Sequence, residues 1–411
     1  VVSGLMPHQT NVRSNSAEHI NPPLPDSIPT LGSLFTANGY EAVHFGKTHD
    51  MGSLRGFRHK EPVAKPFTDP EFPVNNDSFL DVGTCEDAVA YLSNPPQEPF
   101  ICIADFQNPH NICGYVGENK GEHIDSPIST PLPLLPENFE VEDWEKLPLP
   151  IQYICCSHRR MMQAAHWNED NYRHYVAAFQ HYTRIVARQI ESVLEALYST
   201  PAGKNTIVIV LADHGDGMGS HRMVTKQVSF YEEMTNVPFI IAGPGIHPRQ
   251  KPVEDLLTQP TIDLLPTLCE LAGIPVPSSK PGISLAPFLK GEKQKRQHPY
   301  AASEWHSEYE VTVSPGRMIR SPRYKYTHYL EGNGEELYDM LKDKGERRNL
   351  AHDPKYSKIL AEHRALLDDY IRRTQDDYRS LKVEADKRWR SHAPGYPNHE
   401  GPCARDIINR K

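Results

Sequence analysis

A short acidic and glycine-rich segment carries the clearest chemistry in this chain of 411 residues. Asp213 and His214 directly follow a run of apolar, mostly β-branched residues from 207 to 212, which predicts a fully buried strand. Open α/β sheets place their sites at the carboxyl ends of parallel strands. Glycines at 215, 217 and 219 would let the chain turn so that both side chains reach one cation, and carboxylate oxygen favours calcium. On these residues alone, an ordinary polar turn is an equal alternative.

Two more predicted strands end in charged residues. The first, from 40 to 45, leads into Lys47 and His49, which lie two positions apart and therefore point to the same side of an extended chain. The second, from 100 to 106, leads into His110. Taken alone, the residues of the first set are more typical of a solvated turn, and His110 is more typical of an ordinary loop histidine.

The residues after Gly219 keep a series of fixed offsets. They read Ser220-His221-Arg222, then Lys226, then Phe230-Tyr231-Glu232-Glu233, then a Val237-Pro238 strand that ends in Gly243-Pro244-Gly245. With the Asp-His-Gly and Gly-Lys-Thr-His segments, this pattern resembles the sulfatase family, the formylglycine-dependent branch of the alkaline phosphatase superfamily. Ser220 and Thr48 depart from the family's usual Gly and Trp.

The resemblance assigns roles to individual side chains. Positive charge neutralises sulfate oxygens and an acid protonates the departing alcohol in sulfate-ester hydrolysis. By resemblance, the catalytic residues are Lys47, His49, His110 and Lys226, the substrate-binding residues are His221 and His306, and the metal ligands are Asp213 and His214, with calcium as the expected ion.

The nucleophile implied by the resemblance is a cysteine oxidised to formylglycine in a Cys-x-Pro-Ser-Arg signature. The segment from Ser3 to His8 resembles the stretch that follows this signature, which places the cysteine, the first strand and the other metal ligands upstream of Val1. We therefore expect residues 1–411 alone not to turn over a sulfate ester. The nearest internal copy, from Cys155 to Arg159, lacks the proline.

The predicted fold class is α/β, with a large mixed, mostly parallel sheet flanked by helices. We expect a catalytic domain over 1–295 and a smaller α+β subdomain with an antiparallel sheet and a tail over 296–411. Apolar spacing predicts helices over 169–198, from Pro260, and over 355–374, and strands over 316–320 and 324–329.

Composition narrows the classes of partner. A net charge of -9 and a pI near 6.2 argue against general nucleic-acid binding, and no apolar run is long enough to span a membrane. By resemblance, the substrate is a sulfated glycan, either a sulfate ester or a sulfamate of a glycosaminoglycan, and the protein is secreted, periplasmic or lysosomal. Two alternatives stay open: a phosphomonoester, phosphodiester or phosphonate hydrolase of the same superfamily, and a non-catalytic protein that binds sulfated glycans.

Overall fold

The computed structural model describes residues 1–13, 23–48, 51–65, 80–121, 123–124, 131–140, 146–152, 159–226, 229–254, 256–292, 298–309 and 312–383. The chain forms two compact units that interleave along the sequence. The first comprises 1–111, 180–211 and 238–298, and the second comprises 112–179, 212–237 and 299–411. Each unit is described by itself, and the domain boundary at residue 295 stays a prediction.

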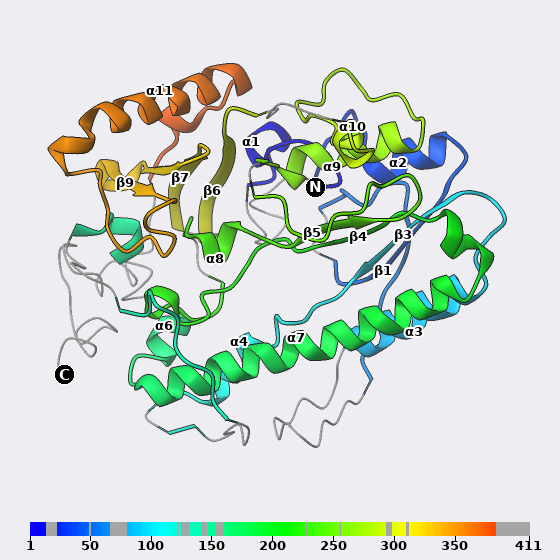
Figure 1. Ribbon diagram of the computed structural model, residues 1–411, viewed down its shortest axis with the longest axis horizontal. Helices are drawn as coiled ribbons and strands as arrows, with labels where there is room; N and C mark the ends of the chain where they lie inside the picture. The colour runs from blue at the N-terminus through cyan, green and yellow to red at the C-terminus, as the bar shows by residue number, and fades with distance from the viewer. Residues whose placement is uncertain are drawn as a thin grey trace. The chain divides into compact units, whose positions relative to one another are not determined.

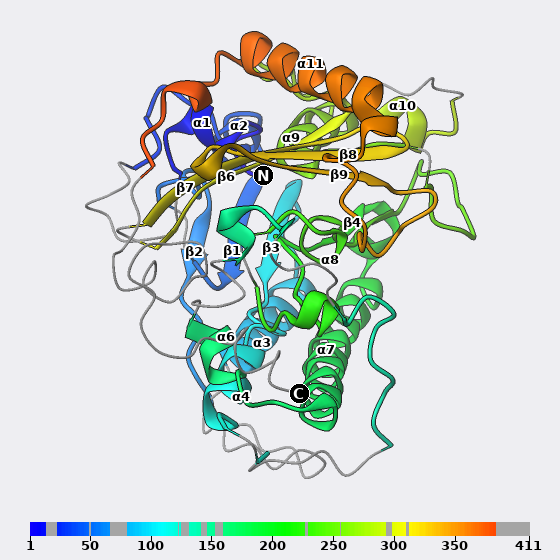
Figure 2. The ribbon, with the colours of Figure 1, turned by 90° about the vertical axis from the view of Figure 1, so that its left-hand side faces the viewer.

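A three-stranded parallel sheet organises the first unit, in the order β2-β1-β3 (Figure 2). Its strands are β1 (Glu41–Gly46), β2 (Arg58–Lys60) and β3 (Phe100–Asp105). The register pairs Gly46 with Asp105, so β1 and β3 end at the same edge. The segments that carry Lys47 and His110 therefore begin side by side.

Helices cover both faces of this sheet. Val43 and Phe45 of β1 pack against Ala88 of α3 (Leu80–Ser93). A second cluster joins Leu31 of α2 (Leu31–Ala37) to Leu265 of α9 (Pro260–Leu271) and includes Ile101 of β3. Alternate residues of β3 thus face opposite helical layers, because side chains alternate across a strand.

The predicted helices are confirmed. The long helix α7 spans Glu169–Tyr198, and α9 begins at Pro260, where a proline costs no intrahelical hydrogen bond. Thr30 is the N-cap of α2 and accepts a hydrogen bond from the Ser33 N–H at 3.2 Å, as expected for a capping box. Within the described ranges, every helix is too short or too polar to cross a membrane.

The prediction for the strand before Asp213 is wrong in two respects. This strand, β4 (Val208–Leu211), pairs antiparallel with β5 (Phe239–Ala242), and all four of its residues are half-buried. A short continuous apolar run specifies neither the direction of its partner nor how completely it is covered, because its sequence has no alternation to read.

A four-stranded antiparallel sheet, in the order β6-β7-β8-β9, organises the second unit. Its strands are β6 (Ala301–Tyr309), β7 (Thr312–Arg320), β8 (Tyr324–Tyr329) and β9 (Gly334–Asp339). Helix α11 (Ser357–Thr374) lies along this sheet (Figure 1) and buries Leu360, Leu367 and Tyr370. The α/β class and the C-terminal antiparallel sheet are therefore confirmed.

Short helices complete the units: α1 (Pro7–Thr10) and α10 (Ala286–Leu289) belong to the first, and α4 (Ile112–Glu118), α6 (Arg159–Gln163) and α8 (Glu232–Thr235) belong to the second.

Candidate active site

Lys47 follows β1 at the edge where the parallel strands end. Its N–H donates to the Asp105 carbonyl at 3.1 Å, which holds the backbone of the two strand ends together. Gly46 has φ +112°, and a Cβ there would lie 2.1 Å from the Asp105 oxygen. Only glycine, which has no Cβ, lets the two strand ends come this close together. The lysine is half-buried, and His49, predicted beside it, lies outside the described residues.

His110 belongs to a tight turn after β3. The Asp81 carboxylate on α3 accepts the N–H groups of Gln107 at 2.5 Å and Asn108 at 2.8 Å, and the His110 N–H donates to the Gln107 carbonyl at 2.9 Å. Burial raises the pKa of Asp81, and these two N–H donors oppose that shift. A carboxylate on a helix thus fixes the backbone that presents His110.

Asp213 and His214, in the second unit, lie close enough to share one cation. The His214 Nδ1 contacts the Gly215 carbonyl at 2.7 Å, which in a neutral imidazole requires Nδ1 to carry the proton. The Nε2 atom lies 3.5 Å from the Asp213 Oδ2. Two lone-pair donors at this separation fit a divalent cation between them, and both side chains are open to solvent.

Gly215 lets this loop pass directly under α8. Its N–H donates to the Met234 carbonyl at 3.0 Å and the next N–H donates to the Glu233 carbonyl at 3.1 Å. A Cβ at position 215 would lie 1.7 Å from the Glu233 oxygen. The glycine that follows the two candidate ligands is therefore required by packing.

A buried tyrosine anchors the middle of the same loop. The Tyr175 hydroxyl donates to Asp216 and accepts the N–H of Thr225 at 2.6 Å, one residue before Lys226. Burial raises the pKa of Asp216, and the bond from Tyr175 opposes this. One turn earlier on α7, the Tyr172 hydroxyl donates to the Arg222 carbonyl at 3.0 Å. Helix α7 thus holds the backbone on which Lys226 is placed.

His221 lies inside the second unit and is 4% exposed. Its ring stacks on Tyr231 with 4.0 Å between centroids, and its N–H donates to the Asn138 carbonyl at 2.8 Å. Burial lowers the pKa of His221 to about 4, so the imidazole is neutral at physiological pH. His306, the other predicted substrate-binding residue, is half-buried on β6.

The predicted site residues therefore divide between the units. Lys47 and His110 belong to the first unit, whereas Asp213, His214, His221, Lys226 and His306 belong to the second. Within its own unit, each set is placed by a strand end or by an anchored loop.

The comparisons with known proteins decide the family. A model of the sulfatase family matches residues 1–274. The chain belongs to the sulfatase family. A model of the C-terminal region of N-sulphoglucosamine sulphohydrolase also matches, over residues 219–373. The prediction of a sulfuric ester hydrolase is confirmed, and membership of the family implies a divalent metal and formylglycine.

Individual relatives of this sulfatase agree. A Delta 4,5-hexuronate-2-O-sulfatase from Bacteroides thetaiotaomicron is 78% identical over 409 residues, covering 100% of this chain and 85% of the relative. A solved structure of a 2-O glycosaminoglycan sulfatase shares 78% identity with a TM-score of 0.93, covering 99% of this chain and 87% of that one. A phosphonate monoester hydrolase of Agrobacterium radiobacter has a TM-score of 0.69 at 19% identity, covering 92% and 86%, which shows a shared fold alone.

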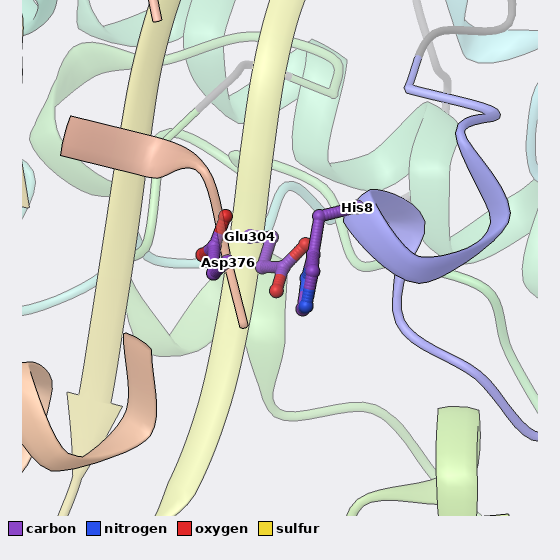
Figure 3. A group of neighbouring side chains, drawn as sticks. All are labelled: His8, Glu304 and Asp376. Carbon is purple, nitrogen blue, oxygen red and sulfur yellow. The ribbon is translucent and has the colours of Figure 1, made fainter. Parts of the chain in front are cut away.

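The C-terminal sheet of this sulfatase contains a buried ion pair. Arg317 on β7 holds the Asp376 carboxylate through two bonds of 2.7 and 3.0 Å, and its Nε lies 4.0 Å from Glu304 on β6. Figure 3 labels both carboxylates, together with His8 of the first unit. Because Arg317 lies within ion-pair distance of both carboxylates and Glu304 also accepts from the Tyr370 hydroxyl, we assign Glu304 and Asp376 to the packing of the second unit.

Sequence reasoning missed two residues that support the site in this sulfatase. Tyr175 belongs to the apolar stripe of α7, and nothing in that spacing distinguishes a hydroxyl that anchors a loop from an aromatic ring in the core. Asp81 lies on a helix more than twenty residues before the turn that it fixes, and a lone acidic residue in the first turn of a helix is ordinary. No local pattern points to either role.

Proposed function

We propose that this sulfatase hydrolyses the 2-O-sulfate ester of an unsaturated hexuronate in a glycosaminoglycan fragment. The observation that carries the proposal is the 78% identity, over the whole chain, to a Delta 4,5-hexuronate-2-O-sulfatase. A uronate with a C4=C5 double bond has no glycosidic link at O4, so it is the non-reducing end of its fragment. The proposal therefore implies action on chain ends.

We assign the reaction to the residues that the sequence predicts. Lys47 and Lys226 would neutralise sulfate oxygens, because fixed positive charge stabilises the charge that develops there. His49 and His110 would hold and transfer the proton needed by the departing sugar oxygen. Asp81 accepts two backbone N–H groups of the turn that carries His110. These bonds limit the motion of the turn, which supports the assignment of His110.

His221 and His306 are proposed to contribute to substrate binding. Because burial keeps His221 neutral, it would offer a hydrogen bond and packing rather than positive charge. His306 lies half-buried on β6, on the same strand as Trp305, whose ring stacks on Phe230 at 5.6 Å between centroids.

Asp213 and His214 would hold the divalent cation, which we propose is calcium. The tautomer fixed by the Gly215 carbonyl leaves His214 Nε2 available to a metal. When bound, the cation would supply positive charge for the sulfate group, and the formylglycine of the family would supply the nucleophile. The loop that carries both ligands is held by Tyr175 and Gly215.

We extend the proposal to partner and compartment. We propose that the substrate is a sulfated glycan. Because members of the family act on substrates outside the cytosol, we propose that the protein is secreted, periplasmic or lysosomal. The absence of a membrane-spanning helix among the described residues does not choose between these compartments.

The substrate assignment is tested with three matched disaccharides and the protein made by its native gene. The first has an unsaturated uronate with a 2-O-sulfate, the second has the same uronate unsulfated beside a 6-O-sulfated hexosamine, and the third has a saturated 2-O-sulfated uronate. We expect sulfate, measured by ion chromatography, from the first only. Release from the second alone contradicts the proposal, and equal release from the first and third removes the requirement for the double bond.

A further inference from the structure

Asn108 is buried beside the predicted catalytic residues, yet its side chain is not satisfied. The residue is 6% exposed, and neither Oδ1 nor Nδ2 has a hydrogen-bond partner among the described residues. A buried amide without partners is costly, so such a group in a native fold calls for an explanation.

The surroundings of Asn108 place it at the carboxyl edge of the parallel sheet. Its backbone N–H donates to Asp81 Oδ2 at 2.8 Å, and it lies two residues before His110. The turn leaves β3 next to the point where β1 delivers Lys47, since Gly46 pairs with Asp105. The amide therefore belongs to the same turn as His110, and that turn begins beside the strand end that delivers Lys47.

The Asp81 carboxylate does not satisfy the amide. The Asn108 amide approaches the Asp81 carboxylate closely enough to lower its pKa, against the larger raising effect of burial, but this contact falls short of hydrogen-bond geometry. A carboxylate can only accept, so it offers nothing to the carbonyl oxygen Oδ1. The neighbouring amide of Gln107 differs, because its Nε2 donates to Asn111 Oδ1 at 3.0 Å.

The chemistry of the missing partner follows from the amide. A carboxamide has a donor in Nδ2 and an acceptor in Oδ1. A sulfate group only accepts, so it would satisfy Nδ2 and leave Oδ1 without a partner. A sugar hydroxyl donates and accepts, so it satisfies both. In a uronate that carries its sulfate on C2, the adjacent hydroxyl is on C3.

We propose that Asn108 is a specificity-determining residue that binds the sugar hydroxyl next to the reacting sulfate ester. The inference rests on the proposed function, because it takes a 2-O-sulfated uronate as the substrate. Asp81 holds the backbone of the turn, so the point from which the side chain extends is fixed before substrate arrives. Binding then supplies the hydrogen bonds that the buried amide lacks.

The experiment tests whether Asn108 and the C3 hydroxyl of the uronate interact. The variant Asn108→Leu keeps the size of the side chain and removes both polar atoms, and Gln107→Leu is the matched control. Each protein, made by its native gene, is assayed by sulfate release from the unsaturated 2-O-sulfated disaccharide and from its 3-deoxy analogue. Wild type is expected to prefer the hydroxyl-bearing substrate by about tenfold to a hundredfold in kcat/KM, the range for a buried hydrogen bond.

Asn108→Leu is expected to lose that preference through a lower rate on the hydroxyl-bearing substrate, while Gln107→Leu keeps it. The urea midpoint of Asn108→Leu is expected to equal or exceed that of wild type, because an unsatisfied buried amide is removed. Retention of the preference in Asn108→Leu overturns the inference, and so does a lower midpoint with an equal loss on both substrates. If wild type releases no sulfate from the 2-O-sulfated substrate, the proposed function itself fails.

Discussion

The change Tyr175→Phe removes one oxygen atom from the anchor between α7 and the loop of Asp216. The hydroxyl is fully buried, and it links the Asp216 carboxylate to the N–H of Thr225. Phenylalanine fills the same space, so the change leaves packing intact and deletes two hydrogen bonds. The N–H of Thr225 then loses the acceptor that Tyr175 provides, and Asp216 Oδ1 loses one of its two hydrogen-bond donors.

The structure sets the size of the effect. An unsatisfied buried N–H costs about 1–3 kcal/mol, and a hydrogen bond to a charged group is worth about 1.5–3 kcal/mol. The Met218 N–H still donates to Asp216 Oδ1 at 3.0 Å and offsets part of the loss. We therefore expect Tyr175→Phe to lower the free energy of unfolding by about 3 kcal/mol, a large share of the usual total of about 5–15 kcal/mol.

Tyr172→Phe is the matched control, because it is the same chemical change one turn earlier on α7. Its hydroxyl donates to the neutral Arg222 carbonyl at 3.0 Å, so its loss should cost about 1 kcal/mol. Urea unfolding followed by tryptophan fluorescence suits both variants, since the Trp167 ring lies 5.5 Å from the ring of Tyr172 and 5.8 Å from that of Tyr175.

Activity should separate the two variants in the same order. Thr225 immediately precedes Lys226, so a loosened Thr225 allows the proposed sulfate-binding lysine to move. We expect Tyr175→Phe to reduce kcat/KM on the sulfated substrate by about tenfold or more, as misplacement of a positioned group does, and Tyr172→Phe to reduce it less. Equal stability and equal activity of the two variants would refute the reasoning.

Three further changes test other parts of the second unit. Arg317→Met leaves Asp376 as an unpaired buried charge and should cost about 3–5 kcal/mol in urea unfolding, whereas adding Asp376→Asn should restore part of the loss; no restoration contradicts the pairing. Burial raises the pKa of Glu346 from 4.5 to about 8, although Lys325 opposes the shift. Its contribution to stability is therefore fully present below pH 4.5 and is lost as pH rises through about 8, by up to about 1.4 kcal/mol per pH unit. In the variant Glu346→Gln, the free energy of unfolding obtained from urea titrations should depend less on pH between pH 5 and 8, by up to about 1.4 kcal/mol per pH unit. An unchanged pH profile argues against a buried ionisation. Asp213→Asn should reduce the calcium that copurifies with the protein, measured by mass spectrometry of the metal, and full retention of calcium removes Asp213 from the metal site.

Local sequence patterns predicted the parts of the fold that depend on local physics. The 3.6-residue spacing of apolar side chains over 169–198 and Pro260 at the start of α9 located these helices correctly. The direction and partner of β4 depended on a strand thirty residues later, and a continuous apolar run does not encode either one.

Charged residues that follow predicted strands pointed to part of the candidate site without the family resemblance. Lys47 and His110 were proposed in this way, and the register of β1 with β3 explains why their segments start side by side. Asn108 and Tyr175 were not found, because their roles depend on which buried atoms meet a partner in the folded chain. The assignments of the eight predicted site residues remain predictions.

The central claim, removal of the uronate 2-O-sulfate, is tested most directly by nuclear magnetic resonance on one disaccharide. The substrate carries both a 2-O-sulfate on an unsaturated uronate and a 6-O-sulfate on its hexosamine, and it is incubated with the protein made by its native gene. We predict that the uronate H2 signal moves to the position of the unsulfated sugar while the hexosamine H6 signals stay in place. Movement of the H6 signals with an unchanged H2 would contradict the account.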